Sequence, residues 1–358
     1  MVPARGERAT VDVLQQRNQE INDSGGPKKA ARNVFVAARM FDEREAKERA
    51  MIVTRQPDAG GSATAVIATK TGTIVRVKGV PIGGNAVQMI AGPCSVETEP
   101  QMRAAAAAVA AGGARLMRGG AFKPRTSPYA FQGAGVEGLR LLRESAARHG
   151  LGVVTELMDV RMLDAFLQEG VDVIQIGTRN MQNFDLLKEV GRVDVPVILK
   201  RGMSATISEW LMAAEYIAAG GNHRIVLCER GIRTFETAYR NVLDVTAIPV
   251  LKRETHLPVI VDPSHAGGKA WLVEALACAA VAAGADGLLV EVHPNPPEAW
   301  CDADQALTPT EFTRLMQRLG AVATAVGRSM TGAPDGAVAQ REGIPLPRAH
   351  EHSCRGAL

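Results

Sequence analysis

The sequence lacks any strong imbalance of charge. Its 358 residues carry 41 Lys and Arg against 38 Asp and Glu, a formal net charge of +3. A nucleic-acid-binding protein would present a strongly basic face, so we expect no nucleic-acid partner. Long apolar runs are also missing: none approaches the roughly 20 residues of a membrane span, and the first residues, MVPARGERAT, lack the apolar core of a signal peptide. We therefore expect no membrane association and a cytoplasmic location.

Cysteine is scarce and scattered. Cys94, Cys228, Cys278, Cys301 and Cys354 include no pair at CxxC spacing. The odd number and the wide spacing argue against a disulfide framework or a structural zinc knuckle. Each thiol has to be judged by its own surroundings.

What the sequence does contain is a regular alternation. Eight short apolar runs, from about residue 88 onward, read QMIAGP, ARLMRGG, GVVTEL, VDVIQIG, VPVILKRG, RIVLCERG, PVIVDPSH and DGLLVEVH. The Ala- and Leu-rich segments expected to be helical between and after them are 99–111, 135–149, 160–169, 206–219, 233–246, 268–283 and 308–326. Eight buried strands, each followed by a helix, over about 240 residues predict an α/β fold, a (β/α)₈ TIM barrel. A doubly wound open sheet is the alternative, but no GxGxxG turn follows the first strand.

The ends of the chain differ from this middle part. Residues 1–50 mix charged and apolar groups and predict a short helical extension. Residues 51–87, which include TGTIVRVKGVPIGG, predict a linker and a capping hairpin, and the barrel is expected over 88–328. The Gly- and Pro-rich tail, 329–358, is expected to be largely disordered.

Charged side chains follow almost every predicted strand. Active sites of these barrels lie at the carboxyl ends of the strands. In chain order, those ends carry Cys94, Arg118 with Lys123, Glu156, Arg179, Lys200 with Arg201, Glu229 with Arg230, Asp262 with His265, and Glu291 with His293. Five or more cations on one rim would repel each other strongly unless an anion lay among them. The rim is therefore predicted to bind a substrate with a phosphate and a carboxylate, or two phosphorylated substrates.

The segment RGGAFKPRTSPY concentrates this charge. Arg118, Lys123 and Arg125 stand in it without an acidic residue. Arg125 and the hydroxyl of Thr126 can hold a second phosphate, which the turn formed by the prolines keeps apart from the first. The alternative for any one of the rim cations is an ordinary salt bridge to a neighbouring carboxylate.

A second group of residues has the chemistry of metal ligands. A thiolate, an imidazole and two carboxylates suit a divalent transition metal such as Mn, Fe, Co or Zn. The candidate ligands are Cys94, His265, Glu291 and Asp302. The first, seventh and eighth strands are neighbours in a closed barrel, so their carboxyl ends meet. Cys94 can equally be an ordinary buried thiol, and His293 and Asp304 compete for the third and fourth ligand positions.

Long motifs of the chain resemble one known family. AGPCSVE, RGGAFKPRTSPY, IQIGTRNMQNFDLLKEVG, LKRGMSATISEW, GNHRIVLCERGIRT, VDPSHAGGK and EVHPNPPEAWCD are similar to those of 3-deoxy-D-arabino-heptulosonate 7-phosphate synthases of the shorter bacterial type. The resemblance covers about residues 87–327. It implies condensation of phosphoenolpyruvate, erythrose 4-phosphate and water with release of phosphate, the first step of the shikimate pathway.

The resemblance also implies roles for individual residues. Arg118 and Lys123 would hold the carboxylate side of phosphoenolpyruvate. The other substrate-binding residues would be Arg179, Lys200 and Arg230 at its phosphate, Arg125 and Thr126 at the phosphate of erythrose 4-phosphate, and Glu156. Cys94, His265, Glu291 and Asp302 would hold one divalent metal, which polarises the aldehyde. We expect Lys123, Cys94 and His265 to be catalytic, with Lys123 the proton donor to the developing alkoxide.

Two alternatives and some details stay open at this point. A synthase of 3-deoxy-octulosonate 8-phosphate would use arabinose 5-phosphate, but it usually carries Lys-Ala-Asn-Arg-Ser where this chain has KPRTS. A catalytically silent regulatory barrel would need none of the candidate residues. Residues 10–56 faintly resemble the last helix and linker of chorismate mutase-fused relatives, so we expect no mutase activity and consider a chorismate mutase a possible partner. Family precedent suggests a homotetramer, and Thr178 stands where relatives usually carry Ala.

Overall fold

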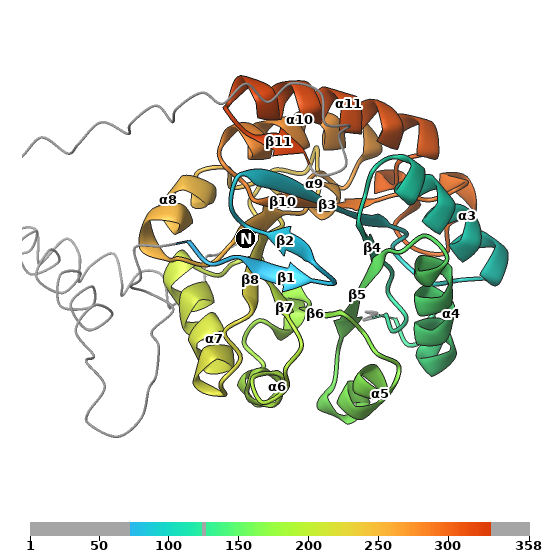
Figure 1. The fold of residues 1–358 in the computed structure, drawn as a ribbon, viewed down its shortest axis with the longest axis horizontal. Helices are drawn as coiled ribbons and strands as arrows, with labels where there is room; N and C mark the ends of the chain where they lie inside the picture. Colours follow the sequence, from blue (N-terminus) through green and yellow to red (C-terminus); the bar gives the residue numbers. More distant parts are fainter. Residues whose placement is uncertain (1–71, 124–126, 331–358) are drawn as a thin grey trace, which may run out of the picture. The chain divides into compact units, whose positions relative to one another are not determined.

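Eight parallel strands form a closed barrel in the computed structural model, which describes residues 72–123 and 127–330. The strands are β3 (Ala86–Gly92), β4 (Leu116–Arg118), β5 (Gly152–Leu157), β6 (Val173–Ile176), β7 (Val197–Lys200), β8 (Ile225–Glu229), β9 (Val259–Val261) and β10 (Gly287–Glu291). Each pairs with the next, and β10 returns to pair with β3 (Figure 1). This closure confirms the predicted TIM barrel and excludes the open sheet.

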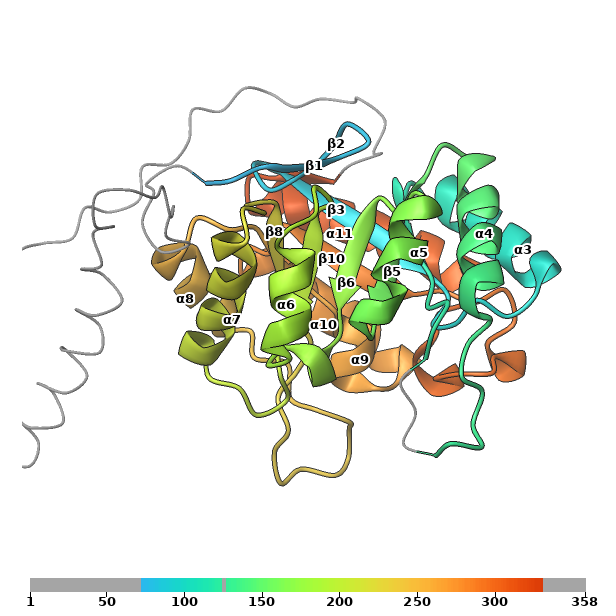
Figure 2. The same ribbon diagram turned by 90° about the horizontal axis from the view of Figure 1, so that it is seen from below.

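Helices surround the barrel on its outside (Figures 1 and 2). They are α3 (Glu99–Ala111), α4 (Gly135–Ala147), α5 (Leu163–Gln168), α6 (Phe184–Val190), α7 (Ile207–Ala219), α8 (Ala247–Glu254), α10 (Ala270–Ala282) and α11 (Pro309–Ala325). The short helix α9 (Pro263–Gly267) instead lies at the carboxyl end of the barrel (Figure 2). The starts of the helices follow local sequence signals. In α7, for example, the Thr206 side chain accepts from the Glu209 amide while the Glu209 carboxylate accepts from the Thr206 amide, which is a capping box.

The prediction of a helix over 233–246 is wrong. That stretch is a loop, in which Ile232 and Val242 form an isolated antiparallel bridge, and the helix begins only at Ala247. Side chains compete there with helical hydrogen bonds, since the Glu236 carboxylate accepts from two backbone amides just after it. The loop therefore lies at the carboxyl end of the barrel, where it can contribute to a site.

A β-hairpin closes the amino end of the barrel. Strands β1 (Val75–Val77) and β2 (Val80–Ile82) pair antiparallel around a turn at Lys78 and Gly79, whose φ angles are 45° and 80°. The apolar side chains of the hairpin join those of the barrel interior in one buried cluster: Val75, Val77, Val80, Ile82, Ile90, Leu116, Val154, Val173, Ile198, Val226, Cys228, Ile260 and Leu289. With this end filled, the carboxyl end is the one left for a pocket.

One short strand outside the barrel pairs with the first strand of the barrel. Strand β11 (Ser329–Met330) pairs in parallel with Ala86 and Val87 of β3. Strand β3 begins two residues before the range 88–328 expected for the barrel, and β11 ends two residues after it. The helical extension, most of the linker and the remainder of the tail lie outside the described residues, and so do Arg125 and Thr126. Across the part of the chain that the structure describes, no helix combines the length and the apolar character that crossing a bilayer requires.

The hairpin contact gives a test of the fold. Ile82 is 0% exposed, so Ile82→Ala removes buried methyl and methylene groups and is expected to lower the free energy of unfolding by about 2–5 kcal/mol. Ile74, next to β1, is 47% exposed, and Ile74→Ala should cost less than about 1 kcal/mol. Urea unfolding followed by circular dichroism measures both values. Equal effects would show that the hairpin does not fill the barrel end.

Candidate active site

The carboxyl ends of the strands surround a pocket of about 110 Å³. Its lining is mostly charged: Lys123, Glu156, Gly177, Thr178, Arg179, Lys200, Met203, Arg230, Arg240, His265, Cys301 and Asp302. Seven of these are residues that the sequence analysis assigned to a site. Arg118, Cys94 and Glu291 are buried next to residues of this lining, as the contacts below show.

The four candidate metal ligands lie together. Their ligand atoms, one each from Cys94, His265, Glu291 and Asp302, are within 4.8 Å of one another. The barrel closure explains part of this proximity, because Glu291, the last residue of β10, pairs with Gly92, two residues before Cys94. Asp302 reaches the cluster from a backbone turn with φ 53°. The donor set fits a divalent transition metal, and we call these four residues the ligand cluster.

The two competing residues are engaged elsewhere. His293 faces Glu97, with 3.4 Å between Nε2 and Oε2, and its Nδ1 accepts from the Asn295 amide at 3.1 Å. Asp304 is exposed and pairs with Lys269 at 2.7 Å. Neither side chain belongs to the ligand cluster.

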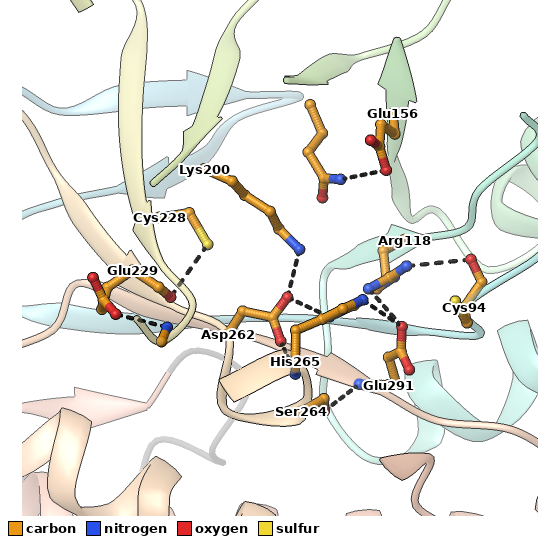
Figure 3. A network of polar contacts seen from close by, with 12 residues as sticks. Cys94, Arg118, Glu156, Lys200, Cys228, Glu229, Asp262, Ser264, His265 and Glu291 are labelled. Carbon is orange, nitrogen blue, oxygen red and sulfur yellow. Dashed lines mark hydrogen bonds and ion pairs between the residues drawn. The ribbon is translucent and has the colours of Figure 1, made fainter. Parts of the chain in front are cut away.

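A buried carboxylate, Asp262, links the ligand cluster to the cations of the pocket (Figure 3). Its Oδ2 lies 2.7 Å from His265 Nδ1 and 2.5 Å from Lys200 Nζ, and its Oδ1 accepts from the His265 amide at 2.8 Å. Burial would raise the pKa of Asp262, but His265 and Lys200 hold that pKa well below its ordinary value. An ionised Asp262 beside Nδ1 of His265 keeps a proton on Nδ1 and leaves Nε2 free toward the ligand cluster.

Further side chains hold the carboxylates of the ligand cluster. Arg118 Nη1 lies 3.1 Å from Glu291 Oε1, and Gln305 Nε2 donates to Glu291 Oε2 at 2.8 Å. Arg240 Nη1 donates to Gln305 Oε1 at 3.0 Å and lies 3.6 Å from Asp302 Oδ1. Burial would raise the pKa of Asp302, but His265 and Arg240 lower it to about 2. Both carboxylates are therefore held in fixed positions by neighbouring donors.

Gln305, Arg240 and the role of Asp262 were not predicted from the sequence. Gln305 lies after the last strand of the barrel. Arg240 lies in the segment that was expected to be a helix. No pattern of residue types marked them. Asp262 did carry a signal, because it stands at the end of a strand three residues before His265.

The rim cations are only partly unpaired. Arg118 and Lys200 each have a carboxylate partner, Glu291 and Asp262, so for these two cations the salt-bridge alternative holds. Arg230 differs: it is buried, and its Nε and Nη1 have no hydrogen-bond partner among the described residues. Burial lowers its pKa below the ordinary value. A buried guanidinium with unused donors is best satisfied by an anion in the pocket.

Lys123 reaches the ligand cluster directly. Its Nζ lies 3.0 Å from the Cys94 carbonyl oxygen and 3.0 Å from Cys94 Sγ. Burial would lower the pKa of Lys123, but the neighbouring side chains of Cys94 and Cys301 raise it above its ordinary value. The ammonium group is thus charged at neutral pH and points toward the ligand cluster.

Glu156 occupies its place because a glycine, Gly177, directly follows the next strand, β6. A Cβ at Gly177 would lie 1.9 Å from Glu156 Oε1. The carboxylate also accepts from Gln175 Nε2 at 3.4 Å. It therefore stands in the pocket without a salt bridge to any cation in the described residues, free to contact a substrate.

A closed barrel, a ligand cluster suited to a divalent metal and a cationic pocket beside it define a barrel enzyme that acts on anionic substrates. Comparison with known proteins identifies the family of barrel enzymes to which the chain belongs. Residues 65–326 match the model of the DAHP synthetase I family, and the chain belongs to this family. The finding agrees with the resemblance drawn from the motifs.

Individual relatives support the assignment. The chain is 49% identical over 255 residues to the phospho-2-dehydro-3-deoxyheptonate aldolase of Thermotoga maritima, covering 71% of this chain and 75% of the relative. It is 35% identical over 268 residues to the 2-dehydro-3-deoxyphosphooctonate aldolase of Syntrophotalea carbinolica, covering 69% and 95%. The crystal structure of the Thermotoga maritima enzyme superposes with a TM-score of 0.71 at 48% identity, covering 73% of this chain and 76% of that one. A truncated form of that synthase gives a TM-score of 0.70 at 43% identity, covering 75% and 100%.

Asp262 provides a test of how the site is built. Asp262→Asn keeps the shape but removes the charge that orients His265 and neutralises Lys200, so affinity for a divalent metal is expected to fall by about 10–100-fold. Metal content after dialysis against graded Mn²⁺ or Zn²⁺ measures the change. The control Asp304→Asn alters an exposed carboxylate and should leave the affinity unchanged. Equal affinities in the two variants would exclude a role for Asp262 in holding His265.

Proposed function

We propose that this protein condenses phosphoenolpyruvate with D-erythrose 4-phosphate and water to give 3-deoxy-D-arabino-heptulosonate 7-phosphate and phosphate. This reaction is the first step of the shikimate pathway. One observation carries the proposal: Asp262 joins a ligand cluster to a cationic pocket, so an aldehyde and a phosphorylated acid can be held side by side. Family membership supports the same activity.

The pocket suits phosphoenolpyruvate in a definite orientation. Arg179, Lys200 and Arg230 supply donors for its phosphate, and the unused donors of Arg230 are the clearest sign of an anion there. Its carboxylate would lie toward Arg118 and Lys123, whose charges are closest to the ligand cluster. This arrangement directs C3 of phosphoenolpyruvate toward an aldehyde at the ligand cluster.

Residues of the chain then carry the chemistry. A metal held by Cys94, His265, Glu291 and Asp302 would supply Lewis-acid polarisation of the aldehyde. As C3 of phosphoenolpyruvate attacks, Lys123 gives a proton to the developing alkoxide. Water adds at C2, and phosphate leaves into the contacts of Arg179, Lys200 and Arg230. Arg125 and Thr126 would hold the phosphate of erythrose 4-phosphate.

The competing substrate is arabinose 5-phosphate. The Syntrophotalea carbinolica relative is a 2-dehydro-3-deoxyphosphooctonate aldolase, but its identity to the chain is 35% against 49% for the heptonate enzyme. The sequence KPRTS at 123–127 also favours the four-carbon aldehyde, because octulosonate synthases usually carry Lys-Ala-Asn-Arg-Ser there. A silent regulatory barrel would have no need of the ligand cluster or of the unpaired Arg230.

Several finer points stay predictions. They are the identity of the metal among Mn, Fe, Co and Zn, the cytoplasmic location, the homotetramer and a chorismate mutase partner. None of them enters the argument for the activity. Each can be tested on the purified full-length protein.

Phosphate release tests the activity and the aldehyde together. With phosphoenolpyruvate, erythrose 4-phosphate and Mn²⁺, we expect release at about 1–10³ s⁻¹, the usual range of enzymes. Arabinose 5-phosphate should give release at least about tenfold slower, and EDTA should abolish both reactions. No release with any of the four metals would exclude the enzyme, and undiminished release in EDTA would exclude the metal.

Lys123 can be tested as the proton donor. Lys123→Met keeps the length of the side chain but removes the acid, so kcat should fall by about 10²–10⁴-fold. The matched control is Lys269→Met, which changes an exposed lysine paired with Asp304 and should leave kcat unchanged. Calorimetric titration with phosphoenolpyruvate separates loss of binding from loss of catalysis. A variant that keeps wild-type kcat would remove Lys123 from the mechanism.

A further inference from the structure

A buried carboxylate and imidazole join two loops next to the ligand cluster. Glu97, on the loop after β3, faces His293, which follows β10, with 3.4 Å between Oε2 and Nε2. Their side chains are 4% and 5% exposed. Because Nδ1 of His293 accepts from the Asn295 amide, its Nε2 carries a proton and donates to Glu97. The proposed reaction uses neither residue, so a carboxylate buried here requires another explanation.

Glu97 also holds the backbone of the segment that carries Asp302. Its Oε1 accepts from the Trp300 amide at 2.9 Å and from Ser95 Oγ at 2.8 Å. Trp300 stands two residues before Asp302, whose φ of 53° is a left-handed backbone conformation. A residue other than glycine keeps such a conformation where its surroundings hold it.

The segment has little regular structure of its own. Over 293–302, its one regular element is the 3₁₀ turn η3 (Pro296–Glu298). The loop of Glu97 is anchored on α3, where the Gln101 side chain accepts from the Glu97 amide at 3.4 Å and donates to the Ser95 carbonyl oxygen at 3.3 Å. Glu97 is therefore a fixed point from which the segment is placed.

The side chain of Trp300 reaches a second functional group. Its ring meets that of Phe131 edge-on, with centroids 4.9 Å apart and an interplanar angle of 82°. The residue after Phe131, Gln132, accepts at its carbonyl oxygen from the Lys123 amide at 2.9 Å. Trp300 is 53% exposed, so this contact lies outside the hydrophobic core. The ring pair thus joins the segment of Asp302 to the loop of Lys123.

We propose that Glu97 is a positioning residue, which through Trp300 holds the candidate metal ligand Asp302 and the proton donor Lys123 in one arrangement. The backbone amide of Trp300 places the ligand, and its ring places the donor. The link to Asp302 is independent of the proposed synthase activity, whereas the link to Lys123 rests on it. Glu97 and Trp300 act through the groups that they hold.

A carboxylate suits this place better than an amide does. Glu97 accepts from three donors, which belong to Ser95, His293 and Trp300. Burial would raise the pKa of Glu97, but the hydrogen bonds from these three residues lower it below its ordinary value. Glutamine has one acceptor oxygen, so its amide nitrogen would face either the Trp300 amide or His293 Nε2, donor against donor. Glu97→Gln therefore breaks a contact with almost no change of volume.

The link to Asp302 is measured by metal affinity, with Mn²⁺ and the full-length protein in equilibrium dialysis. Glu97→Gln is expected to weaken binding by about 10–100-fold, as loss of a group that orients a ligand does. Glu97→Gln/Asp302→Ala should bind within about twofold of Asp302→Ala alone, because Glu97 then has no ligand left to position. Additive losses, or unchanged affinity in Glu97→Gln, would overturn the proposal.

Two further variants separate positioning from charge. Glu97→Asp keeps the charge but withdraws it from the Trp300 amide, so it should also weaken Mn²⁺ binding by at least about tenfold. Wild-type affinity in this variant would reduce the effect to charge and exclude positioning. The matched control is Glu99→Gln, which changes an exposed carboxylate paired with Arg103 and should bind Mn²⁺ like the wild type.

The link to Lys123 is measured by turnover at saturating Mn²⁺. Trp300→Ala keeps the amide that Glu97 holds, so Mn²⁺ affinity should stay within about twofold of wild type while kcat falls about 3–10-fold. Trp300→Phe keeps a ring for Phe131 and should restore most of kcat. The control Trp271→Ala removes an indole that is 76% exposed on α10 and should leave kcat unchanged.

The two measurements fail separately. Wild-type kcat in Trp300→Ala, or the same loss in Trp300→Phe, would overturn the link to Lys123. If the wild type releases no phosphate from the two substrates, the synthase assignment and the link to Lys123 fall together. The Mn²⁺ affinities then still decide whether Glu97 positions Asp302.

Discussion

The interaction on which the site depends is the buried pairing of Asp262 with Lys200 and His265. An isolated buried carboxylate would be strongly unfavourable, and breaking such a pair by removing one partner typically costs about 3–5 kcal/mol. The carboxylate follows β9, the lysine ends β7 and the histidine lies on α9. One side chain thus fixes the distance between the cations that suit a phosphate and the residues that suit a metal. A joining reaction needs that fixed separation, because both reactants must be held in contact.

Carboxylates of the protein neutralise most of the cations around the pocket. The rim therefore does not carry a general excess of positive charge. Five or more cations stand at the strand ends, but Arg118 pairs with Glu291 and Lys200 with Asp262, and Arg201 pairs with two further carboxylates. The remaining demand for an anion is concentrated at Arg230, which is buried with two unused donor nitrogens. A single phosphate among Arg179, Lys200 and Arg230 satisfies that demand better than a general excess of positive charge would.

The sequence predicted the barrel and the ligand cluster for clear physical reasons. Buried strands and amphipathic helices alternate along the chain, and closure brings the ends of strands one, seven and eight together whatever the loops do. Arg240 and Gln305 could not be found this way, because loop conformation alone brings them beside Asp302 and Glu291. The same holds for the contact of Cys301 with Cys94. Residue types in a loop do not reveal which strand end the loop returns to.

Glycine at the strand ends explains how so many charged groups fit around one pocket. Gly92, with φ 152°, ends β3, and a Cβ there would lie 2.1 Å from the Arg118 carbonyl oxygen. Gly120 leaves room for Lys123, whose Nζ is 3.0 Å from where a Cβ would stand, and Gly177 does the same for Glu156. Each of these glycines lies near a functional side chain in the sequence. A Cβ at its position would occupy space that a neighbouring group now fills. The strand ends place the charged side chains around the rim of the barrel. Because the glycines there have no side chain, the space between these charged groups stays open as a pocket that can hold substrate.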